Sequence, residues 1–544
     1  MQLSNESVPP ADQVTTHPSM RWRSVSELVD ARAASTPDAP AAAFPTGESS
    51  YAELAASSLV AARKLRAAGV GPGDRVGILL REACEPYAAL GLGAMRLGAM
   101  CVAINARNKT HELAYVTEHA GLRVLLSSAE FEPLLDEAGL PDGCVRIIIG
   151  DPEFHAGADQ VSPTEVAELE GAVDRDTPAL LLYTSGSTAN PKGCLHTHGT
   201  MLAEGYNCLE RLELTPGDRF WTPLAMFHVG GWQVLMSALA AGACFSHAGM
   251  FEADSALDQL ERERVTVAMP AFELIWMSVL EHPRLSETDL SALRVVMNVG
   301  VPERLQHMQA LLPHVVQLSM IGMTESCGSI CMGSPGDSLY SRTHTSGRPL
   351  PGMEVRVVDP ETGEECPAGV PGELLFRGVT RLAEYYRDPQ TTASMIDSDG
   401  WLHTGDLVRQ DEDGAIGFVN RLKDMLKVGG ENASAAEIEG YLINHPAVAV
   451  AAVVGAPDSR YGEVAAAFVK TVPGMDVTEQ ELIDYCVGHI ATYKVPRYIR
   501  FVDDYPTTAT QKIKKFELRT RIECELRDRG ISEAPKLDSR RSGS

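Results

Sequence analysis

The stretch "LLYTSGSTANPKGCLHTHG", residues 181–199, places a cluster of hydroxyl side chains, glycines and one lysine directly behind a short apolar run. Gly186 and Gly193 permit positive φ, so backbone N–H groups of this segment can converge on one anion. Lys192 adds a positive charge. The hydroxyl groups are those of Thr184, Ser185, Ser187 and Thr188. We therefore predict a loop that binds a chain of phosphates.

This loop differs from the Walker-type phosphate-binding loop. In the pattern G-x-x-x-x-G-K-[ST] a glycine precedes the lysine, whereas here Pro191 precedes Lys192. A second glycine-rich stretch, "GLGAMRLGAM" from Gly91, superficially matches a dinucleotide-binding loop, but its third glycine is misplaced. Its alanines and leucines recur at helical spacing, which favours a packed helix.

The composition of the chain limits the partners that it can have. At 544 residues it exceeds the roughly 100 to 250 residues of one domain. Its 73 acidic and 47 basic side chains give a formal net charge of −26, which repels nucleic acid and anionic lipid. No segment reaches the roughly 20 apolar residues of a membrane span, and the N-terminus lacks a signal-peptide pattern. The 11 cysteines are scattered, so we expect a cytoplasmic protein with reduced thiols.

Short apolar runs alternate with alanine-rich segments from about residue 24 to 180 and again from 200 to 335, which predicts parallel α/β layers. Turn clusters within "VRVVDPETGEECPAGVPGELLFRG", residues 355–378, predict a small antiparallel barrel or meander. Short βα units then return up to about residue 530. We place a domain boundary between Arg421 and Asp424. The expected fold is a large N-terminal domain, residues 1–422, of layered α/β subdomains plus a β-barrel-like subdomain, and a small α+β C-terminal domain, residues 423–544.

Taken with four later motifs, the loop resembles the signature of the adenylate-forming (ANL) superfamily. The later motifs are, in order, "GMTE" at 322–325, "GWLHTGD" at 400–406, "NRLKDMLKVGGENASAAEIE" at 420–439 and "TTATQKIKK" at 507–515. The resemblance extends from about residue 24 to 520. Within the superfamily, the sequence is most similar to the pattern of stand-alone acyl-CoA ligases. It implies activation of a carboxylic acid by ATP as an acyl-AMP, followed by transfer of the acyl group to coenzyme A, with a mobile C-terminal domain.

The resemblance also assigns roles around ATP. A carboxylate that attacks a phosphate must overcome repulsion between anions, so a cation and a metal are needed beside the reactants. By resemblance Lys512 is the mobile catalytic lysine that touches both reactants, and Glu325 holds Mg²⁺. The residues implied to bind the nucleotide are Thr324 at the phosphates, Asp406 and Arg421 at the ribose, Gly300 at the adenine, and Thr184, Ser185, Gly186, Ser187, Thr188 and Lys192 in the loop.

The second half-reaction is implied to use the same cavity after the C-terminal domain rotates. Lys423 occupies the hinge position, and Gly429 and Gly430 match the loop that lines the pantetheine tunnel. His228, in "MFHVGGW", matches a family position between the ATP site and the acyl pocket, although a histidine on an apolar segment is more often structural. The acyl pocket, by motif position, comprises Val229, Gly230, Trp232, Met297, Met320, Ile321, Cys327 and Ile330. These residues are mostly apolar and predict an uncharged aliphatic or alicyclic acid.

Three positions depart from the family pattern. Ala189 replaces a loop glycine, Ile321 replaces a tyrosine expected beside adenine, and Gln511 replaces the glycine next to the catalytic lysine. All three lie on elements that serve ATP, while the hinge and the pantetheine loop keep the pattern.

Two alternatives to the complete ligase therefore stay open. One is a half-reaction specialist that converts a preformed acyl-adenylate into its CoA thioester, with a separate adenylating enzyme as partner. The other is a non-catalytic sensor of nucleotide or acyl-CoA. The partners expected in any case are a small carboxylic acid, ATP and CoA, and a homodimer is left open.

Overall fold

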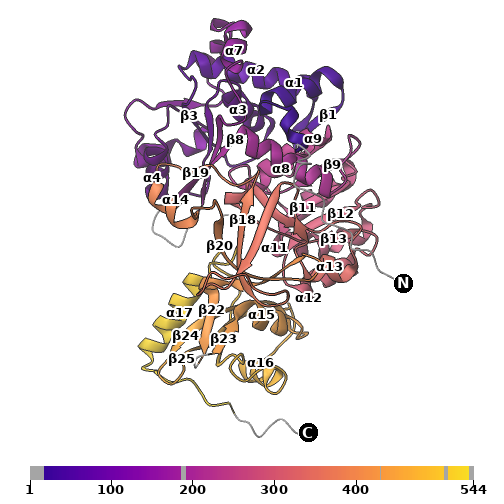
Figure 1. Ribbon diagram of the computed structural model, residues 1–544, viewed down its shortest axis with the longest axis vertical. Coiled ribbons are helices and arrows are strands. Elements are labelled where there is room, and N and C mark those ends of the chain that lie inside the picture. The colour runs from indigo at the N-terminus through magenta and orange to yellow at the C-terminus, as the bar shows by residue number, and fades with distance from the viewer. Residues whose placement is uncertain (1–16, 185–190, 429–430, 508–511, 538–544) are drawn as a thin grey trace, which may run out of the picture.

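The computed structural model describes residues 17–184, 191–428, 431–507 and 512–537. It consists of a large N-terminal part and a smaller C-terminal part that are joined near β21 and β22 (Figure 1). The predicted fold class, a layered α/β N-terminal portion followed by a small α+β portion, is confirmed.

Two seven-stranded sheets form the body of the N-terminal part. The first has the strand order β13 (Val316–Leu318), β12 (Val295–Val299), β11 (Val267–Phe272), β9 (Arg219–Thr222), β10 (Cys244–His247), β1 (Pro40–Phe44) and β2 (Gly47–Ser50). The second has the order β19 (Glu384–Tyr385), β8 (Lys192–Thr197), β7 (Pro178–Thr184), β4 (Met100–Ala103), β3 (Arg75–Leu79), β5 (Val124–Ser127) and β6 (Val145–Ile148). Most neighbouring strands are parallel, as the alternating pattern predicts, whereas β2, β8 and β19 pair antiparallel with their neighbours.

Two smaller antiparallel sheets follow in the chain. One contains β14 (Met320–Met323), β15 (Gly328–Met332) and β16 (Arg348–Pro349). The other contains β17 (Met353–Val358), β18 (Gly372–Gly378), β20 (Leu402–Gln410) and β21 (Ile416–Arg421), which confirms the antiparallel meander expected from the turn clusters.

The C-terminal sheet differs from a series of βα units. Its order is β23 (Glu431–Ser434), β22 (Met425–Val428), β25 (Gly462–Thr471) and β24 (Val448–Asp458), with β26 (Tyr498–Phe501) paired to β25. Only the β25 and β26 pair is parallel. The reason is the connection between β24 and β25: residues 459–461 are too few for a helical crossover, so the two strands form a hairpin.

The helices cover the faces of these sheets, with the first fourteen in the N-terminal part (Figure 1). Their bounds are α1 (Val25–Ser35), α2 (Tyr51–Ala67), α3 (Glu85–Arg96), α4 (Thr110–Ala120), α5 (Glu132–Ala138), α6 (Pro152–Ala156), α7 (Pro163–Glu170), α8 (His198–Arg211), α9 (Val229–Ala241), α10 (Ala253–Arg262), α11 (Glu273–Leu280), α12 (Pro302–Leu311), α13 (Leu339–His344), α14 (Pro389–Met395), α15 (Ala435–Ile443), α16 (Glu479–Cys486) and α17 (Lys515–Asp528). Local sequence fixes several starts. Ser50 and Glu53, for example, form a capping box at the N-terminus of α2.

Gly91 and Gly93 of "GLGAMRLGAM" belong to α3, and Gly98 follows the helix with a φ of 66°, so the interpretation as a packed helix is confirmed for the stretch up to Arg96. A Cβ on Gly93 would lie 2.8 Å from both Ala61 Cβ and Ala62 N of α2, and a Cβ on Gly91 would meet the ring of Trp232. The small residues therefore let α3 approach α2 and α9 closely.

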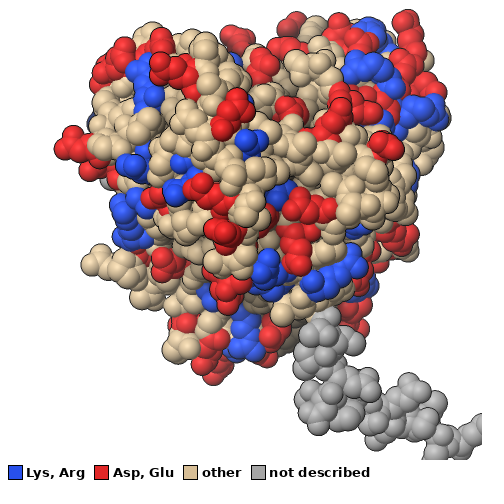
Figure 2. Space-filling model, turned by 90° about the horizontal axis from the view of Figure 1, so that it is seen from above, with Lys and Arg blue, Asp and Glu red and all other residues tan. Residues whose placement is uncertain are grey.

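The apolar cores of the two parts are separate. One set of clusters is built from residues between Val25 and Ile416, and another cluster is built from residues between Leu426 and Ala534. On the upper face of the molecule acidic and basic side chains are interspersed (Figure 2). Within the described residues no helix is both long and apolar enough to cross a membrane.

Candidate active site

The phosphate-loop motif joins β7 to β8, two antiparallel strands in which Thr184 lies opposite Lys192. The Thr184 hydroxyl donates to the Lys192 carbonyl at 3.5 Å. The ammonium of Lys192 lies 5.6 Å from the centre of the Tyr385 ring, which provides a cation–π contact. Ser185, Gly186, Ser187, Thr188 and the departure Ala189 lie outside the described residues. The two ends of the loop are therefore fixed by a strand pair.

Glu325 lies in the short turn η5 (Thr324–Ser326) after β14 and is 8% exposed. The hydroxyl of Tyr385 donates to Glu325 Oε1 at 2.8 Å. Tyr385 is on β19, which pairs with β8, so the tyrosine connects the carboxylate to the strand that begins at Lys192.

Thr324 is anchored to the same strand. His196 Nε2, on β8, donates to the Thr324 carbonyl at 2.8 Å. Burial lowers the pKa of His196 to about 4, so the ring is neutral and carries its proton on the nitrogen that makes this bond. The threonine and glutamate predicted to face the phosphates are thus held beside the base of the phosphate loop.

The donor set around Glu325 fits Mg²⁺. This ion is commonly held by one or two carboxylates together with substrate phosphates and water. Within the described residues no group of three or more His, Cys, Asp and Glu side chains could enclose a metal by itself. Glu325 would therefore hold the ion together with phosphate oxygens, and the bound ion would neutralise charge on the phosphates.

Asp406 and Arg421 face each other across β20 and β21. The guanidinium Nε of Arg421 lies 2.9 Å from Asp406 Oδ1, and Asp406 is 4% exposed. The backbone N–H of Asp406 donates to Thr404 Oγ1 at 3.0 Å. The pair predicted to bind ribose is therefore brought together: Arg421 lies against the carboxylate, and Thr404 fixes the backbone of Asp406.

Gly300 follows β12 and precedes α12 at the surface of the N-terminal part. The nearest heavy atom to a Cβ built on it would be Leu305 Cδ2 at 3.8 Å, an ordinary van der Waals contact, so packing does not demand a glycine here. The preceding Val299 is 44% exposed. This open backbone is consistent with the predicted approach of adenine.

His228 caps the N-terminus of α9, where its Nδ1 accepts from the Gly230 N–H at 3.3 Å. Burial and the nearby Lys512 cation lower the pKa of the ring to about 3. The imidazole is therefore neutral with its proton on Nε2, and this N–H can donate to an oxygen of a ligand. The ring meets Phe272 edge to face, with 6.1 Å between centres.

Lys512 reaches the same place from the C-terminal part. Its Nζ lies 5.4 Å from the centre of the Phe272 ring, the ring that also contacts His228. Phe272 follows Ala271, whose φ of 58° is a left-handed conformation that costs an alanine about 1 kcal/mol. The predicted catalytic lysine and His228 are thus brought together around one aromatic ring.

The other C-terminal positions are less completely described. The backbone of Lys423 lies in η6 (Leu422–Asp424), between β21 and β22, where the two parts of the chain join. Gly429, Gly430 and the departure Gln511 lie outside the described residues.

One core cluster contains six of the residues predicted to form the acyl pocket, and Met320 packs against it; the six are Val229, Trp232, Met297, Ile321, Cys327 and Ile330. Not all of them point the same way. Trp232 packs against α3, with its ring 6.5 Å from that of Tyr87, and the open side of Gly230 is filled by Leu224 and Met269. Met320 and Ile321 lie on β14, which precedes the turn that contains Glu325. Ile330 lies on β15, which follows that turn. Cys327 lies in that turn, and Met297 is fully buried on β12.

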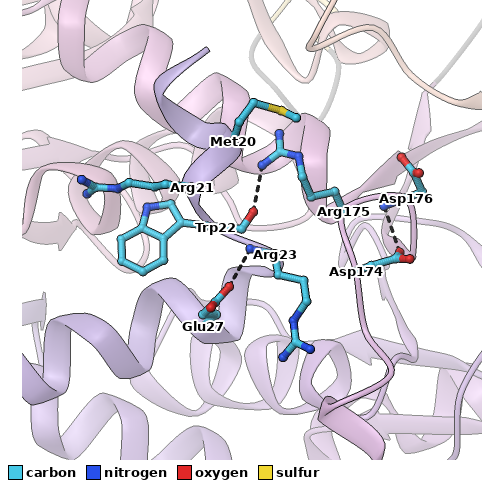
Figure 3. Close-up of a pocket in the computed structure, with 8 residues that line it drawn as sticks. All are labelled: Met20, Arg21, Trp22, Arg23, Glu27, Asp174, Arg175 and Asp176. Atoms are coloured by element: carbon cyan, nitrogen blue, oxygen red, sulfur yellow. Dashed lines mark hydrogen bonds between the residues drawn. The ribbon is translucent and has the colours of Figure 1, made fainter. Parts of the chain in front are cut away.

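A surface hollow lies elsewhere in the N-terminal part. Its lining residues are Met20, Arg21, Trp22, Arg23, Glu27, Asp174, Arg175 and Asp176 (Figure 3). Arg175 donates to the Trp22 carbonyl at 3.0 Å, and the Arg23 N–H donates to Glu27 at 2.6 Å. The hollow shares no residue with the predicted site.

Comparison with known proteins decides the family. A model of AMP-binding enzymes matches residues 29–386, and a model of their C-terminal domain matches residues 437–512. The chain belongs to the AMP-binding enzyme family. Among curated relatives of this AMP-binding enzyme, the putative acyl-CoA synthetase YngI of Bacillus subtilis is 34% identical, over 91% of this chain and 96% of the relative. The 4-coumarate–CoA ligase 3 of Oryza sativa subsp. japonica is 33% identical, over 90% and 91%.

Solved structures agree with this assignment. The anthranilate CoA ligase AuaEII, solved with anthranoyl-AMP, superposes with a TM-score of 0.84 at 28% identity, and the match covers 93% of this chain and 98% of that one. MatB from Rhodopseudomonas palustris, solved with ATP, superposes with a TM-score of 0.81 at 26% identity, over 92% and 99%. The protein is therefore an AMP-forming acid–thiol ligase that binds ATP and uses coenzyme A through an adenylate intermediate.

Three residues of this AMP-binding enzyme's site were not predicted from the sequence: Tyr385, His196 and Phe272. Tyr385 orients Glu325, His196 holds Thr324, and Phe272 lies between His228 and Lys512. Tyr385 and Phe272 belong to none of the motifs quoted above. His196 lies in the phosphate-loop stretch, but nothing in its sequence position marks it as a site residue. Their roles depend on long-range pairing, which local sequence does not reveal.

Proposed function

We propose that the protein is a complete two-step acyl-CoA ligase for an uncharged, mostly apolar carboxylic acid. The observation that supports the proposal is the approach of Lys512 to Phe272 and His228, since the first step needs a cation beside the reactants and these residues would then surround it. The neutral His228 would donate from Nε2 to a substrate oxygen. Glu325 with Mg²⁺ and the phosphate loop would hold the phosphates, while Asp406 and Arg421 would bind the ribose.

The apolar nature of the acid is supported by the core position of the predicted pocket. Cys327, Ile330 and Ile321 are 3%, 1% and 6% exposed, so a charged group beside them would lose most of its hydration. The pocket would therefore select against charged acyl groups unless a counter-charge were supplied.

The half-reaction specialist is supported by one described residue. Ile321, on β14, offers an aliphatic surface where the family pattern has tyrosine, so adenine would lose a stacking contact of about 0.5 to 1.5 kcal/mol. Ala189 and Gln511, the other departures, lie outside the described residues. A weaker ATP site would shift the balance toward thioester formation from ready-made acyl-adenylate.

A pair of assays separates these functions. Purified protein is incubated with ATP, Mg²⁺, radiolabelled pyrophosphate and a panel of apolar acids, and in parallel with synthetic acyl-AMP and CoA. Exchange of label into ATP together with CoA thioester supports the complete ligase. Thioester from acyl-AMP alone supports the specialist, and binding without product in either assay supports a sensor.

The CoA route is tested separately with Gly430→Trp, which should obstruct the predicted pantetheine tunnel. Pyrophosphate exchange should persist while thioester formation falls at least about tenfold. Unchanged thioester formation would contradict the placement of the tunnel.

A further inference from the structure

His119, near the C-terminal end of α4, is surrounded by three tyrosine rings, and the proposed reaction gives it no role. Its ring stacks on Tyr115 with 5.3 Å between ring centres. It meets Tyr183 and Tyr386 edge to face, at 5.8 Å and 6.2 Å between centres. Tyr183 belongs to β7, and Tyr386 directly follows β19. His119 therefore joins a helix to the two strands that flank β8 in the second sheet.

One hydrogen bond connects the histidine to the strand that enters the phosphate loop. Nδ1 of His119 lies 2.8 Å from the hydroxyl oxygen of Tyr183. Burial and the nearby Arg387 cation lower the pKa of His119, so its ring is neutral at pH 7. Burial also raises the pKa of Tyr183, so the phenol keeps its proton. Because a phenol is a stronger donor than a neutral imidazole, we assign the hydroxyl as donor and Nδ1 as acceptor.

The two tyrosines of β7 and β19 hold the backbone at the start of β8. Tyr183 lies opposite Gly193 across the β7 and β8 pair, and a Cβ on Gly193 would lie 3.4 Å from the Tyr183 ring. The Tyr386 N–H donates to the Gly193 carbonyl at 2.8 Å. Thr184 directly follows Tyr183 in the chain, and Lys192 directly precedes Gly193. The contacts of the histidine therefore lead to both described ends of the phosphate loop.

Arg387 fixes the cluster from the other side. Its Nη1 donates to the His119 carbonyl at 3.0 Å, and its guanidinium carbon lies 5.2 Å from the centre of the Tyr386 ring. The φ of Arg387 is 54°, a left-handed conformation that a residue with a Cβ rarely adopts. Strained backbone of this kind persists where the surrounding contacts hold it, and it concentrates at functional sites. The end of α4 is thus tied to the segment after β19 (Figure 1).

We propose that His119 is a positioning residue for ATP, which acts through Tyr183 and Tyr386 to set the positions of Thr184 and Lys192 and so strengthens binding of the β- and γ-phosphates. The inference rests on the proposed function, in which the phosphate loop holds these groups. The histidine acts through the two strands and needs no contact with ATP. Because AMP lacks the β- and γ-phosphates, loss of the histidine weakens ATP far more than AMP. This difference separates positioning of the loop from a general effect on folding.

Binding measured by titration calorimetry tests this without turnover. The probes are α,β-methylene-ATP with Mg²⁺, which carries all three phosphates, and AMP, which carries one. In His119→Leu the Kd of the triphosphate should rise about 5- to 10-fold, while the Kd of AMP should change less than about twofold. Tyr183→Phe should show the same loss, and the double variant should lose no more than either single variant, because both changes remove one bond. His119→Gln, whose amide oxygen can accept from the same hydroxyl, should stay within about threefold of the wild type.

His282→Leu is the matched control. His282 is also half-buried in the N-terminal part, but its Nδ1 accepts from the Arg284 N–H at 3.3 Å. This variant should leave both Kd values within about twofold of the wild type.

The possible results separate the positioning role from the proposed function. Unchanged triphosphate affinity in His119→Leu, equal weakening of the triphosphate and AMP, or losses that multiply in the double variant each overturn the role of His119. Lys192→Ala tests the phosphate loop itself and should raise the triphosphate Kd at least about tenfold. If it does not, the phosphate loop of the proposed function is wrong and the role of His119 falls with it. A loss in Lys192→Ala with none in His119→Leu overturns the positioning role alone.

Discussion

His228 is neutral chiefly because it is buried, and three contacts that do not depend on substrate surround it. Its Nδ1 accepts from Gly230, Phe272 faces its ring, and the Lys512 cation lies near it. The pKa is lowered from 6.5 to about 3, so the folded protein binds fewer protons than the unfolded chain between these values. The contribution of His228 to stability is therefore present above pH 6.5 and is lost as pH falls toward 3.

The first prediction concerns this side chain in catalysis. His228→Ala should lower the rate of pyrophosphate exchange by about 10- to 100-fold, because one donor to a substrate oxygen is lost. Exchange by the wild-type enzyme should show no ionisation of His228 between pH 5 and pH 8. If the exchange rate of the wild-type enzyme changed with pH around a pKa near 6.5, and this change disappeared in His228→Ala, the conclusion that His228 is neutral would be contradicted.

The second prediction concerns the tyrosine that orients Glu325. Tyr385→Phe removes the hydroxyl at 2.8 Å from Oε1 while keeping the ring in the core. We expect the KM for MgATP to rise and kcat/KM of the first step to fall by roughly 5- to 30-fold, with less effect on thioester formation from acyl-AMP. Tyr386→Phe is the matched control, since that ring faces His119 instead of Glu325. Equal losses in both variants would contradict the role.

At the scale of elements, the strands around the site explain what the sequence could and could not predict. Asp406 and Arg421 were assigned by motif, and the β20 and β21 pairing brings them within 2.9 Å. Tyr385 was missed, because its role arises only when β19 pairs with β8, nearly 190 residues away in the chain. The hairpin of β24 and β25 is not predicted either, because apolar runs alone do not indicate whether two paired strands are parallel or antiparallel.

The glycines of α3 give the third prediction. Gly93→Ala would place a Cβ 2.8 Å from the backbone of α2, so we expect a loss of about 1 to 3 kcal/mol in the free energy of unfolding. Urea denaturation measures it. Gly336→Ala, at a position with no heavy atom within 4 Å, should change stability by less than about 0.5 kcal/mol. Similar values for both variants would show that α3 and α2 can separate without cost.

At the scale of the whole molecule, the two parts meet where α15 approaches α12. A Cβ on Gly440 would lie 3.1 Å from Glu303 Oε2, so a long side chain here would have to displace the end of Glu303 in the arrangement that brings Lys512 to the site. The family resemblance implies a different arrangement for the second step.

The fourth prediction follows from that contact. Gly440→Leu should lower pyrophosphate exchange at least about fivefold, because the leucine prevents the C-terminal part from seating against α12. Thioester formation from synthetic acyl-AMP should change less than about twofold. Gln480→Leu, at an exposed helix position of the same part, is the control for a general effect of leucine. An equal loss of both half-reactions in Gly440→Leu would contradict the assignment of this contact to the first step.

The separate cores have a consequence for the energetics of the catalytic cycle. Each described core cluster falls wholly on one side of the junction near Lys423, so the repositioning of the C-terminal part that the family resemblance implies would uncover no shared core cluster. Heat capacity changes mainly with the exposure of apolar surface, so a rearrangement that leaves every core cluster intact should change it little. If the rearrangement limits turnover, the logarithm of rate over temperature should therefore vary almost linearly with reciprocal temperature until the protein itself melts.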